Sequence, residues 1–313
     1  MKVLFITSTR IGDAVLSTSI LNLIKNKFPY SNLYIAVGET SASLFKNFGN
    51  VKRIFVLKKS FFKFHWAKLW FQTFFNKWDI IIDLRGSLIS YLLLNNQKYV
   101  YKSLNKHIHR LEELSNLMKT RNLPLPSIPI LNTDTEKIPK DFLKLRNPIA
   151  IGASANWPAK IWPSKKFVKL IKLLFKEKKF KKERFIVFFG SKNDLKNTKK
   201  IAKHFKNSQV KNLCGKLNLI EVAACLKKCK MFIGNDSGLM HIASACDIPT
   251  LGLFGPSLES RYAHKGKKAY YVRTKKTFEQ LTGKKNFDWN TKKNLMNSLS
   301  VNSVLKKAKQ ILR

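Results

Sequence analysis

Short runs of β-branched and aromatic residues alternate with longer segments of helical periodicity along most of this chain of 313 residues. In the first half we expect strands at residues 2–6, 33–37, 53–56 and 80–83, and helices at residues 15–27, 61–77 and 108–121. Such alternation is typical of βαβ units, in which helices connect parallel strands and cover the sheet. The pattern therefore predicts an α/β fold.

Four prolines, at positions 124, 126, 129 and 139, interrupt this alternation, which then begins again. The second half has expected strands at 149–152, 185–189, 210–213, 231–234 and 250–254, and expected helices at 164–176, 195–206, 219–228 and 239–246. We therefore predict two Rossmann-like parallel-sheet domains, residues 1–145 and 146–313, with ligands in the cleft between them, beside the carboxyl ends of the strands. An amphipathic helix at 301–312 closes the chain, and its periodicity leaves open whether it packs back on the first domain.

The chain is strongly basic, because 60 lysines and arginines against 18 acidic residues give a formal net charge of +42. Nucleic acid, an anionic membrane and phosphorylated substrates are all suitable partners for such a charge. Lysine pairs are spread along the chain from Lys58-Lys59 to Lys306-Lys307, which indicates background composition rather than one binding tract. No recognition-helix or RNP motif occurs, so we expect no nucleic-acid partner and keep a basic nucleic-acid-binding protein as the alternative function.

Several sequence motifs are absent, and their absence disfavours particular classes of protein and of binding site. No apolar run reaches the roughly 18–20 residues that span a bilayer, and the apolar start of the chain is shorter than a signal peptide, so we expect a cytoplasmic protein. The four cysteines, at positions 214, 225, 229 and 246, include no C-x-x-C pair, which favours reduced thiols in a core over a zinc site. The sequence has no P-loop, no G-x-G-x-x-G and no Asp-x-Asp, so we expect neither a metal nor a cofactor.

Two junctions between an expected strand and an expected helix could carry chemistry. Arg10-Ile11-Gly12-Asp13 follows the first strand, and Asp13 could act there as a base or could merely cap the helix, with equal weight for the two roles. The loop at 152–163 follows the first strand of the second half and carries one charge, Lys160. A lysine in that place can neutralise a phosphate, although lysines in so basic a chain are more often solvated surface residues.

The strongest motif is the run from Met231 to Cys246, which is typical of a strand, a turn of small residues and a helix. We expect Asp236 to cap the helix and the backbone amides of Ser237 and Gly238 to face a diphosphate. The alternative is an ordinary capped turn in which His241 is a core histidine.

Together these segments resemble glycosyltransferase family 9, the ADP-heptose:lipopolysaccharide heptosyltransferases. The resemblance covers most of the chain and rests on five segments: Ile11-Gly12-Asp13, WDIIIDLRG at 78–86, Lys160-Ile161-Trp162-Pro163, DSGLMH at 236–241 and FGPS at 254–257. It implies the GT-B fold, two Rossmann-like parallel-sheet domains that face each other across a cleft. It also implies an inverting, metal-independent glycosyltransferase that moves heptose from ADP-heptose to a lipopolysaccharide core or another lipid-linked acceptor.

Carried over position by position, the resemblance makes Asp13 the general base on the acceptor hydroxyl and Lys160 a ligand of the donor diphosphate. It places four further residues in the donor site: Asp236, Ser237, Gly238 and His241. A positioned base and a pocket rich in amides and cations are what displacement of a nucleoside diphosphate requires when no metal is bound. Departures from the family pattern at 155–159 and 191–194 leave open a family relative that uses a different nucleotide sugar.

The segment 61–75 combines aromatic and basic residues. We expect most of its apolar residues to face the core before strand 80–83. The remainder is expected to face an anionic glycolipid acceptor, which would place the protein at the inner leaflet of the membrane as a peripheral protein.

Overall fold

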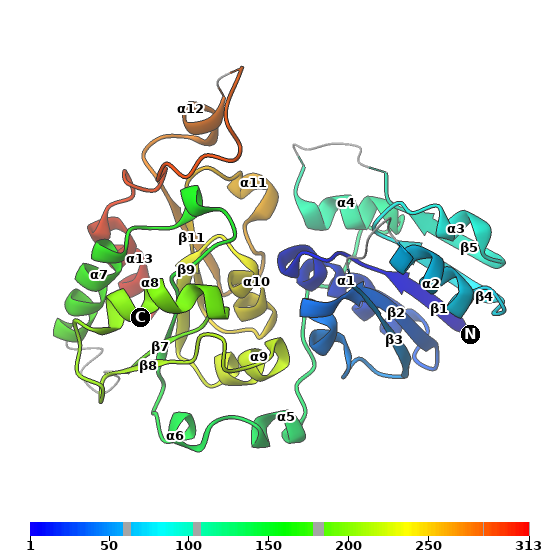
Figure 1. Ribbon diagram of the computed structural model, residues 1–313, viewed down its shortest axis with the longest axis horizontal. Coiled ribbons are helices and arrows are strands. Elements are labelled where there is room, and N and C mark those ends of the chain that lie inside the picture. Colours follow the sequence, from blue (N-terminus) through cyan, green and yellow to red (C-terminus); the bar gives the residue numbers. More distant parts are fainter. Residues whose placement is uncertain (59–63, 103–107, 178–184, 284, 313) are drawn as a thin grey trace. The chain divides into compact units, whose positions relative to one another are not determined.

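The computed structural model describes residues 1–58, 64–102, 108–177, 185–283 and 285–312. The chain forms two compact units, Met1–Leu131 and Asn132–Arg313. Each unit contains one parallel β-sheet covered by helices (Figure 1). The predicted α/β class with two parallel sheets is therefore confirmed.

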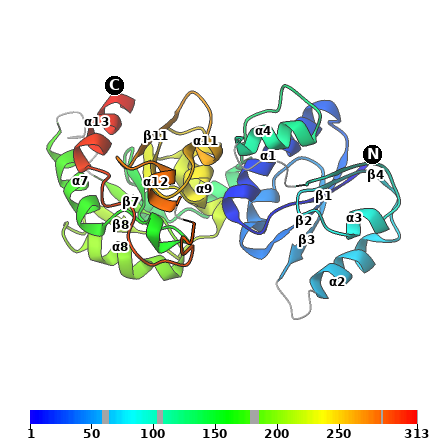
Figure 2. The ribbon, with the colours of Figure 1, turned by 90° about the horizontal axis from the view of Figure 1, so that it is seen from above.

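The first unit has a five-stranded sheet of order β3-β2-β1-β4-β5. Its strands are β1 (Lys2–Ile6), β2 (Asn32–Gly38), β3 (Val51–Leu57), β4 (Trp78–Asp83) and β5 (Asn95–Val100). Its helices are α1 (Ile11–Lys27), the 3-10 helix η1 (Glu39–Phe45), α2 (Phe64–Thr73), α3 (Ile89–Leu92) and α4 (Arg110–Leu117). The chain adds β2 and β3 on one side of β1 and then crosses back to add β4 and β5 on the other side. Because the connections are right-handed, this change of direction places α2 and α3 on the face of the sheet opposite α1 (Figure 2).

The core of the first unit explains the continuous apolar sequence of its central strands. The side chains of β1 are buried on both faces of the sheet from Val3 to Ile6. On one face Leu4 and Ile6 pack in a cluster with Leu69 of α2 and Ile89 of α3. A strand that is buried on both faces cannot alternate apolar and polar residues, which is why such strands read as uninterrupted apolar runs.

The second unit has a six-stranded sheet of order β11-β10-β9-β6-β7-β8. Its strands are β6 (Ile149–Gly152), β7 (Ile186–Phe188), β8 (Val210–Asn212), β9 (Met231–Asn235), β10 (Thr250–Phe254) and β11 (Ala269–Arg273). Its helices are α5 (Asn132–Glu136), α6 (Lys140–Leu143), α7 (Ser164–Lys176), α8 (Leu195–Ala202), α9 (Leu219–Lys227), α10 (Gly238–Ala245), α11 (Glu259–Tyr262), α12 (Phe278–Thr282) and α13 (Val301–Ile311). Two 3-10 helices, η3 (Pro158–Lys160) and η5 (Lys192–Asp194), follow β6 and β7.

The division between the units falls after Leu131, earlier than the boundary predicted between residues 145 and 146. The reason is that α5 packs against α9, so the segment that contains α5 and α6 belongs to the second unit. The final helix α13 packs against α7 and β11 in that same unit. Its apolar side, which includes Val304 and Ala308, joins the core of the second sheet.

The four cysteines are free thiols in the interior, as predicted. Burial raises the pKa of Cys214 to about 11 and the pKa values of Cys225 and Cys246 to about 12, so these thiols stay protonated at neutral pH. Within the described residues, no helix is long and apolar enough to cross a membrane. The expected helix at 61–77 is observed as α2, whereas positions 61–63 of that prediction lie outside the described residues.

Candidate functional site

Asp13 lies in the first turn of α1, just beyond the carboxyl end of β1. The N-cap of α1 is Arg10, and no side chain makes a capping bond there, so Asp13 does not have the capping role that the sequence left open. The side chain of Asp13 is 23% exposed, and its Oδ1 lies 3.6 Å from Nε of Arg110 in α4. The carboxylate is therefore partly accessible and faces a cation from another helix.

Two residues of the same unit, Glu113 and Tyr101, hold Arg110 in place. One of its terminal nitrogens donates to Oε2 of Glu113 at 2.6 Å, and its guanidinium lies 4.3 Å from the ring centre of Tyr101. The Tyr101 hydroxyl donates to the same oxygen of Glu113 at 3.2 Å. Burial alone would lower the pKa of Arg110, but the bond to Glu113 and the charge of Asp13 outweigh it and hold this pKa above its ordinary value. Arg110 is thus a fixed positive charge beside Asp13.

Neither Arg110 nor Glu113 is among the site residues predicted from the sequence. Their spacing of three residues at the start of α4 does indicate an ion pair on one helix face. Nothing in the local sequence links that pair to Asp13, which lies almost a hundred residues earlier. The connection appears only because α4 packs against α1 in the folded unit.

In the second unit, Lys160 and Asp236 form an ion pair. Lys160 ends the 3-10 helix that follows β6, and its Nζ donates to Oδ2 of Asp236 at 2.7 Å. The side chain of Lys160 is 24% exposed, whereas that of Asp236 is only 7% exposed. Two residues that the sequence placed in one donor site, 76 positions apart, are therefore neighbours in space.

Asp236 does not cap α10, which corrects the role predicted for it. The N-cap is Ser237, and no side chain makes a capping bond at this helix. The Asp236 carboxylate instead stays ionised inside the protein. Burial would raise its pKa, but the charges of Lys160 and His241 and the bond from Lys160 outweigh burial and hold the pKa below its ordinary value.

The start of α10 offers backbone amides to a ligand. The first amides of a helix have no acceptor within the helix, and here Ser237 and Gly238 are only half-buried. The hydroxyl of Ser237 is enclosed and has no hydrogen-bond partner within the described residues. Unsatisfied polar atoms of this kind are expected where a ligand or ordered water completes the bonding. His241, also in the first turn of α10, is buried beside Asp236.

Two paired glycines lie directly before this turn. Gly152 at the end of β6 is paired with Gly234 of β9. A Cβ on Gly234 would lie 2.7 Å from the carbonyl oxygen of Gly152, and a Cβ on Gly152 would lie 2.5 Å from the ring of Phe232. Only glycine fits at these positions, so the two strands can approach closely where the Lys160 loop and α10 begin.

The loop that carries Lys160 is fixed by bonds to its neighbours. The backbone amide of Trp162 donates to Oδ1 of Asn235 at 3.0 Å, and the Trp162 indole donates to the carbonyl of Leu299 at 3.1 Å. Lys160 is therefore positioned by a rigid loop rather than by its own flexible stem alone. Across the described part of the chain, no cluster of three or more His, Cys, Asp or Glu side chains could hold a metal ion.

Residues 90–290, well over half of the chain, match the family model described as glycosyltransferase family 9 (heptosyltransferase). The chain belongs to glycosyltransferase family 9. It is therefore a glycosyltransferase, and the predicted family and enzyme class are confirmed. Of the segments that carried the resemblance, the Lys160 loop and the turn at Asp236 lie inside the matched span, whereas Asp13 lies before it.

This family 9 chain is similar to several known proteins over most of its length. It is 28% identical over 273 residues to lipooligosaccharide heptosyltransferase 2 of Campylobacter jejuni, which covers 82% of each chain. It is 25% identical over 316 residues to lipooligosaccharide heptosyltransferase 2 of Haemophilus ducreyi, with 87% of this chain and 88% of the other covered.

Two solved structures share its fold. A family 9 glycosyltransferase from Veillonella parvula superposes with a TM-score of 0.79 at 19% identity, over 99% of this chain and 97% of the other. The ADP-heptose lipopolysaccharide heptosyltransferase II of Escherichia coli superposes with a TM-score of 0.77 at 20% identity, over 100% and 98%. The two parallel-sheet domains of this chain thus have the GT-B fold, as predicted.

Proposed function

We propose that this enzyme transfers heptose from ADP-heptose to a lipid-linked lipopolysaccharide acceptor at the inner face of the membrane. The observation that carries the donor half is the Lys160–Asp236 pair at the start of α10, where a cation, helix amides and an enclosed hydroxyl gather. The names of its relatives support the sugar and the acceptor, since those from Campylobacter jejuni and Haemophilus ducreyi are lipooligosaccharide heptosyltransferases. A similar Escherichia coli heptosyltransferase structure contains ADP.

On the donor side, Lys160 and the amides of Ser237 and Gly238 would hold the diphosphate. Negative charge grows on the diphosphate as the bond between its oxygen and the anomeric carbon breaks. Fixed donors and a positioned cation stabilise that charge without having to reorganise during the reaction. Asp236 would serve this site indirectly, because its buried carboxylate holds the Lys160 ammonium in place. A diphosphate held in this way needs no bridging metal ion, so we propose a metal-independent transfer.

On the acceptor side, Asp13 would take the proton of the acceptor hydroxyl while the hydroxyl oxygen bonds to the anomeric carbon. Arg110 would keep the carboxylate oriented, since Arg110 is itself held by Glu113 and Tyr101. One base and one leaving group suffice for a single displacement. A single displacement inverts the configuration of the anomeric carbon, and inversion is therefore the proposed stereochemical outcome.

Thermal stabilisation by a panel of nucleotide sugars, with free ADP and UDP as controls, tests the donor. We expect ADP-heptose and ADP to raise the melting temperature and UDP compounds to leave it unchanged, because only a compound that binds the folded state stabilises it. A response to a UDP-sugar alone would assign a different nucleotide sugar. Transfer with lipopolysaccharide core acceptors should persist in EDTA and yield the inverted anomer by NMR, and loss of activity in EDTA would contradict the metal-independent mechanism.

A further inference from the structure

The outer surface of α2 and of the α3 region carries an unusual set of exposed apolar side chains. On α2 and the turn after it, Phe64, Phe71 and Phe75 are separated by seven and then four residues, which places them on one side of the helix. Phe71 is 68% exposed and Phe75 is 90% exposed. Around α3, four further large side chains are exposed by half or more: Leu88, Tyr91, Leu92 and Leu94. We call these seven residues the α2–α3 patch.

Both segments of the patch belong to one surface. Leu69 of α2 and Ile89 and Leu93 of the α3 region are buried in the same core cluster, on the same face of the first sheet. Figure 2 shows α2 and α3 close together on that face. Because the inward side chains already supply the core, the outward phenylalanines and leucines add nothing to it. Soluble proteins rarely expose a contiguous apolar surface of this kind without a binding function.

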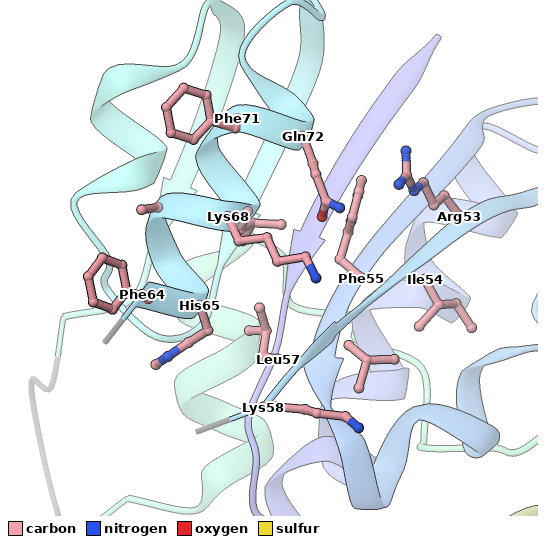
Figure 3. Close-up of a pocket in the computed structure, with 13 residues that line it drawn as sticks. Arg53, Ile54, Phe55, Leu57, Lys58, Phe64, His65, Lys68, Phe71 and Gln72 are labelled. Carbon is pink, nitrogen blue, oxygen red and sulfur yellow. The ribbon is translucent and has the colours of Figure 1, made fainter. Parts of the chain in front are cut away.

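A groove beside the patch combines an apolar floor with basic walls. It has a volume of about 710 Å³ and lies between the edge strand β3 and α2. Figure 3 shows Lys68 and Gln72 extending from α2 over the groove, and Phe64 and Phe71 of the same helix also line it, so the groove and the patch share these two residues. Arg53 lines the opposite wall. On the side of α3, the Nζ of Lys98 lies 4.4 Å from the ring centre of Tyr91, so cations border the patch there too.

One acidic residue from elsewhere in the unit reaches this surface: Glu39 pairs with Lys58 of the groove, with 2.8 Å between Oε1 and Nζ. The segment that carries the patch and the groove is nevertheless strongly basic. Between residues 51 and 102 the sequence has ten lysines and arginines and only two acidic residues, Asp79 and Asp83. Asp79 accepts hydrogen bonds from the amide of Lys2 and the side chain of Asn96. Asp83 is buried and accepts bonds from the amides of Arg85 and Ser87. Both carboxylates thus bond to internal donors, and ten basic residues against two acidic ones leave the segment 51–102 with a positive net charge.

We propose that the α2–α3 patch docks on the surface of an anionic lipid bilayer. Its phenylalanines and leucines enter the boundary between headgroups and acyl chains, and Arg53, Lys68 and Lys98 meet lipid phosphates. Aromatic and leucine side chains bordered by cations are the composition of interfacial membrane anchors. The inference deepens the proposed function, on which it rests for the lipid-linked acceptor, by naming the surface that reaches the membrane.

Charge favours a bilayer over a second copy of the chain. Two copies that paired through this face would bring their basic groove walls together, in a protein whose net charge is already +42. An anionic bilayer instead complements the cations and accepts the apolar side chains in the same contact. Pairing of copies through the patch is therefore the outcome that the test must separate from membrane docking.

Co-sedimentation of the full chain with vesicles tests the proposal. At about 0.15 M salt, where only charges within roughly 8 Å interact strongly, we expect binding to vesicles of phosphatidylcholine with 25–30% phosphatidylglycerol and little binding to phosphatidylcholine alone. The double variants Phe71→Ser/Phe75→Ser and Leu92→Ser/Leu94→Ser should each lower the partition coefficient about tenfold or more. Lys68→Glu should lower it about thirtyfold, because each interfacial cation contributes about 1 kcal/mol and the charge reversal counts twice.

Tyr30→Ser is the matched control, because Tyr30 is 89% exposed but follows α1, which covers the other face of the sheet. It should leave vesicle binding unchanged. Equal loss in Tyr30→Ser, equal binding to neutral vesicles or no binding at all would each overturn the proposal. A concentration-dependent dimer that Phe71→Ser/Phe75→Ser dissociates in sedimentation velocity, without vesicle binding, would assign the patch to a second copy.

The vesicle assay contains neither donor nor sugar acceptor, so its failure can be told apart from a failure of the proposed function. All variants should keep the thermal stabilisation by ADP-heptose. If the protein transfers the sugar to a water-soluble acceptor fragment but does not bind vesicles, the proposed activity stands and only the proposed docking surface is refuted.

Discussion

The two units each place a carboxylate and a cation near the start of a helix that follows a central strand, but they expose opposite members of the pair. In the first unit the cation is the enclosed partner, since the Arg110 side chain is 10% exposed and that of Asp13 is 23% exposed. In the second unit the carboxylate is enclosed, since Asp236 is 7% exposed and Lys160 is 24% exposed. The accessible group is therefore an acceptor of protons in one unit and a cation in the other.

This difference follows from what holds each enclosed member. Arg110 also bonds to Glu113 and packs on Tyr101, so it cannot move toward a ligand and serves only Asp13 and Glu113. Asp236 is held by the turn between β9 and α10 and by Lys160. In the first unit the fixed cation Arg110 thus orients the accessible carboxylate of Asp13. In the second unit the fixed carboxylate of Asp236 orients the accessible cation of Lys160. The first suits a base, and the second suits a phosphate ligand.

Asp13→Asn gives the largest expected effect on this comparison. The amide keeps the shape of the side chain but cannot take a proton, so we expect the rate of glycosyl transfer to fall about 10³-fold. Donor affinity should stay within a few-fold, because the change is confined to the first unit. Steady-state kinetics and calorimetric titration with ADP-heptose measure the two quantities, and a variant with wild-type turnover would remove Asp13 as the base.

Lys160→Met should act on the donor instead. Methionine fills much of the lysine stem but removes the charge, and a charge-assisted hydrogen bond is worth about 1.5–3 kcal/mol, so ADP affinity should fall about 10- to 100-fold. Titration with ADP and with adenosine distinguishes the causes. Adenosine has no phosphate, and its affinity should not change. Parallel losses for both ligands would show that the loop has been disturbed and that Lys160 has no specific role toward the diphosphate.

The central strands could be predicted from the sequence, and so could the edge strands β3 and β8, whereas the other edge strand of each sheet could not. β1, β6 and β10 match the expected ranges because each is buried on both faces and reads as an apolar run. The expected strands do not include β5 and β11, which form one edge of each sheet. Exposure of an edge permits polar residues such as those of β5, NNQKYV, so the periodic apolar signal disappears.

The site shows a similar limit. Lys160, Asp236 and Ser237 lie in loops and turns with a recognisable local pattern, and the structure brings Lys160 and Asp236 together. Arg110 contacts Asp13 from a helix that is distant in sequence, and no motif near residue 13 or near residue 110 predicts the contact. Local patterns identified the groups that could face a ligand, but the groups that hold them in place depend on tertiary packing.

Asp236→Asn should reduce stability because it leaves Lys160 without its partner. The loss of a buried, charge-assisted bond predicts a decrease of about 1–3 kcal/mol in the free energy of unfolding at pH 7. The pKa of Asp236 is lower in the folded chain than its ordinary value of 3.8, so the stabilisation is present above that value and is lost as the pH falls through the folded pKa. Urea denaturation at pH 7 and near pH 3 should show the difference from wild type shrinking in acid.

The control for that variant is Asp247→Asn, which removes a surface pair with Lys268 in which the two side chains are 83% and 49% exposed. Surface ion pairs contribute little, so this change should cost less than about 0.5 kcal/mol. Equal losses in the two variants would mean that the enclosed Asp236 contributes no more than a surface carboxylate.

Arg110→Gln has the smallest expected effect on turnover, because it leaves the reacting groups in place and removes the cation that orients Asp13 and pairs with Glu113. We expect kcat to fall about three- to tenfold, since a misplaced base still transfers protons but less often in the right geometry. Donor affinity should not change, and Arg110→Lys should recover part of the loss because it restores the charge without the fork that reaches Glu113. A general structural defect would lower the melting temperature and kcat together, and Arg110→Lys would then rescue neither.

The roles of the two units are separated most sharply by the double variant Arg110→Gln/Lys160→Met. If Arg110 serves only the base and Lys160 only the diphosphate, their effects on kcat and on ADP affinity should add independently, and a strong coupling between them would contradict the division of roles.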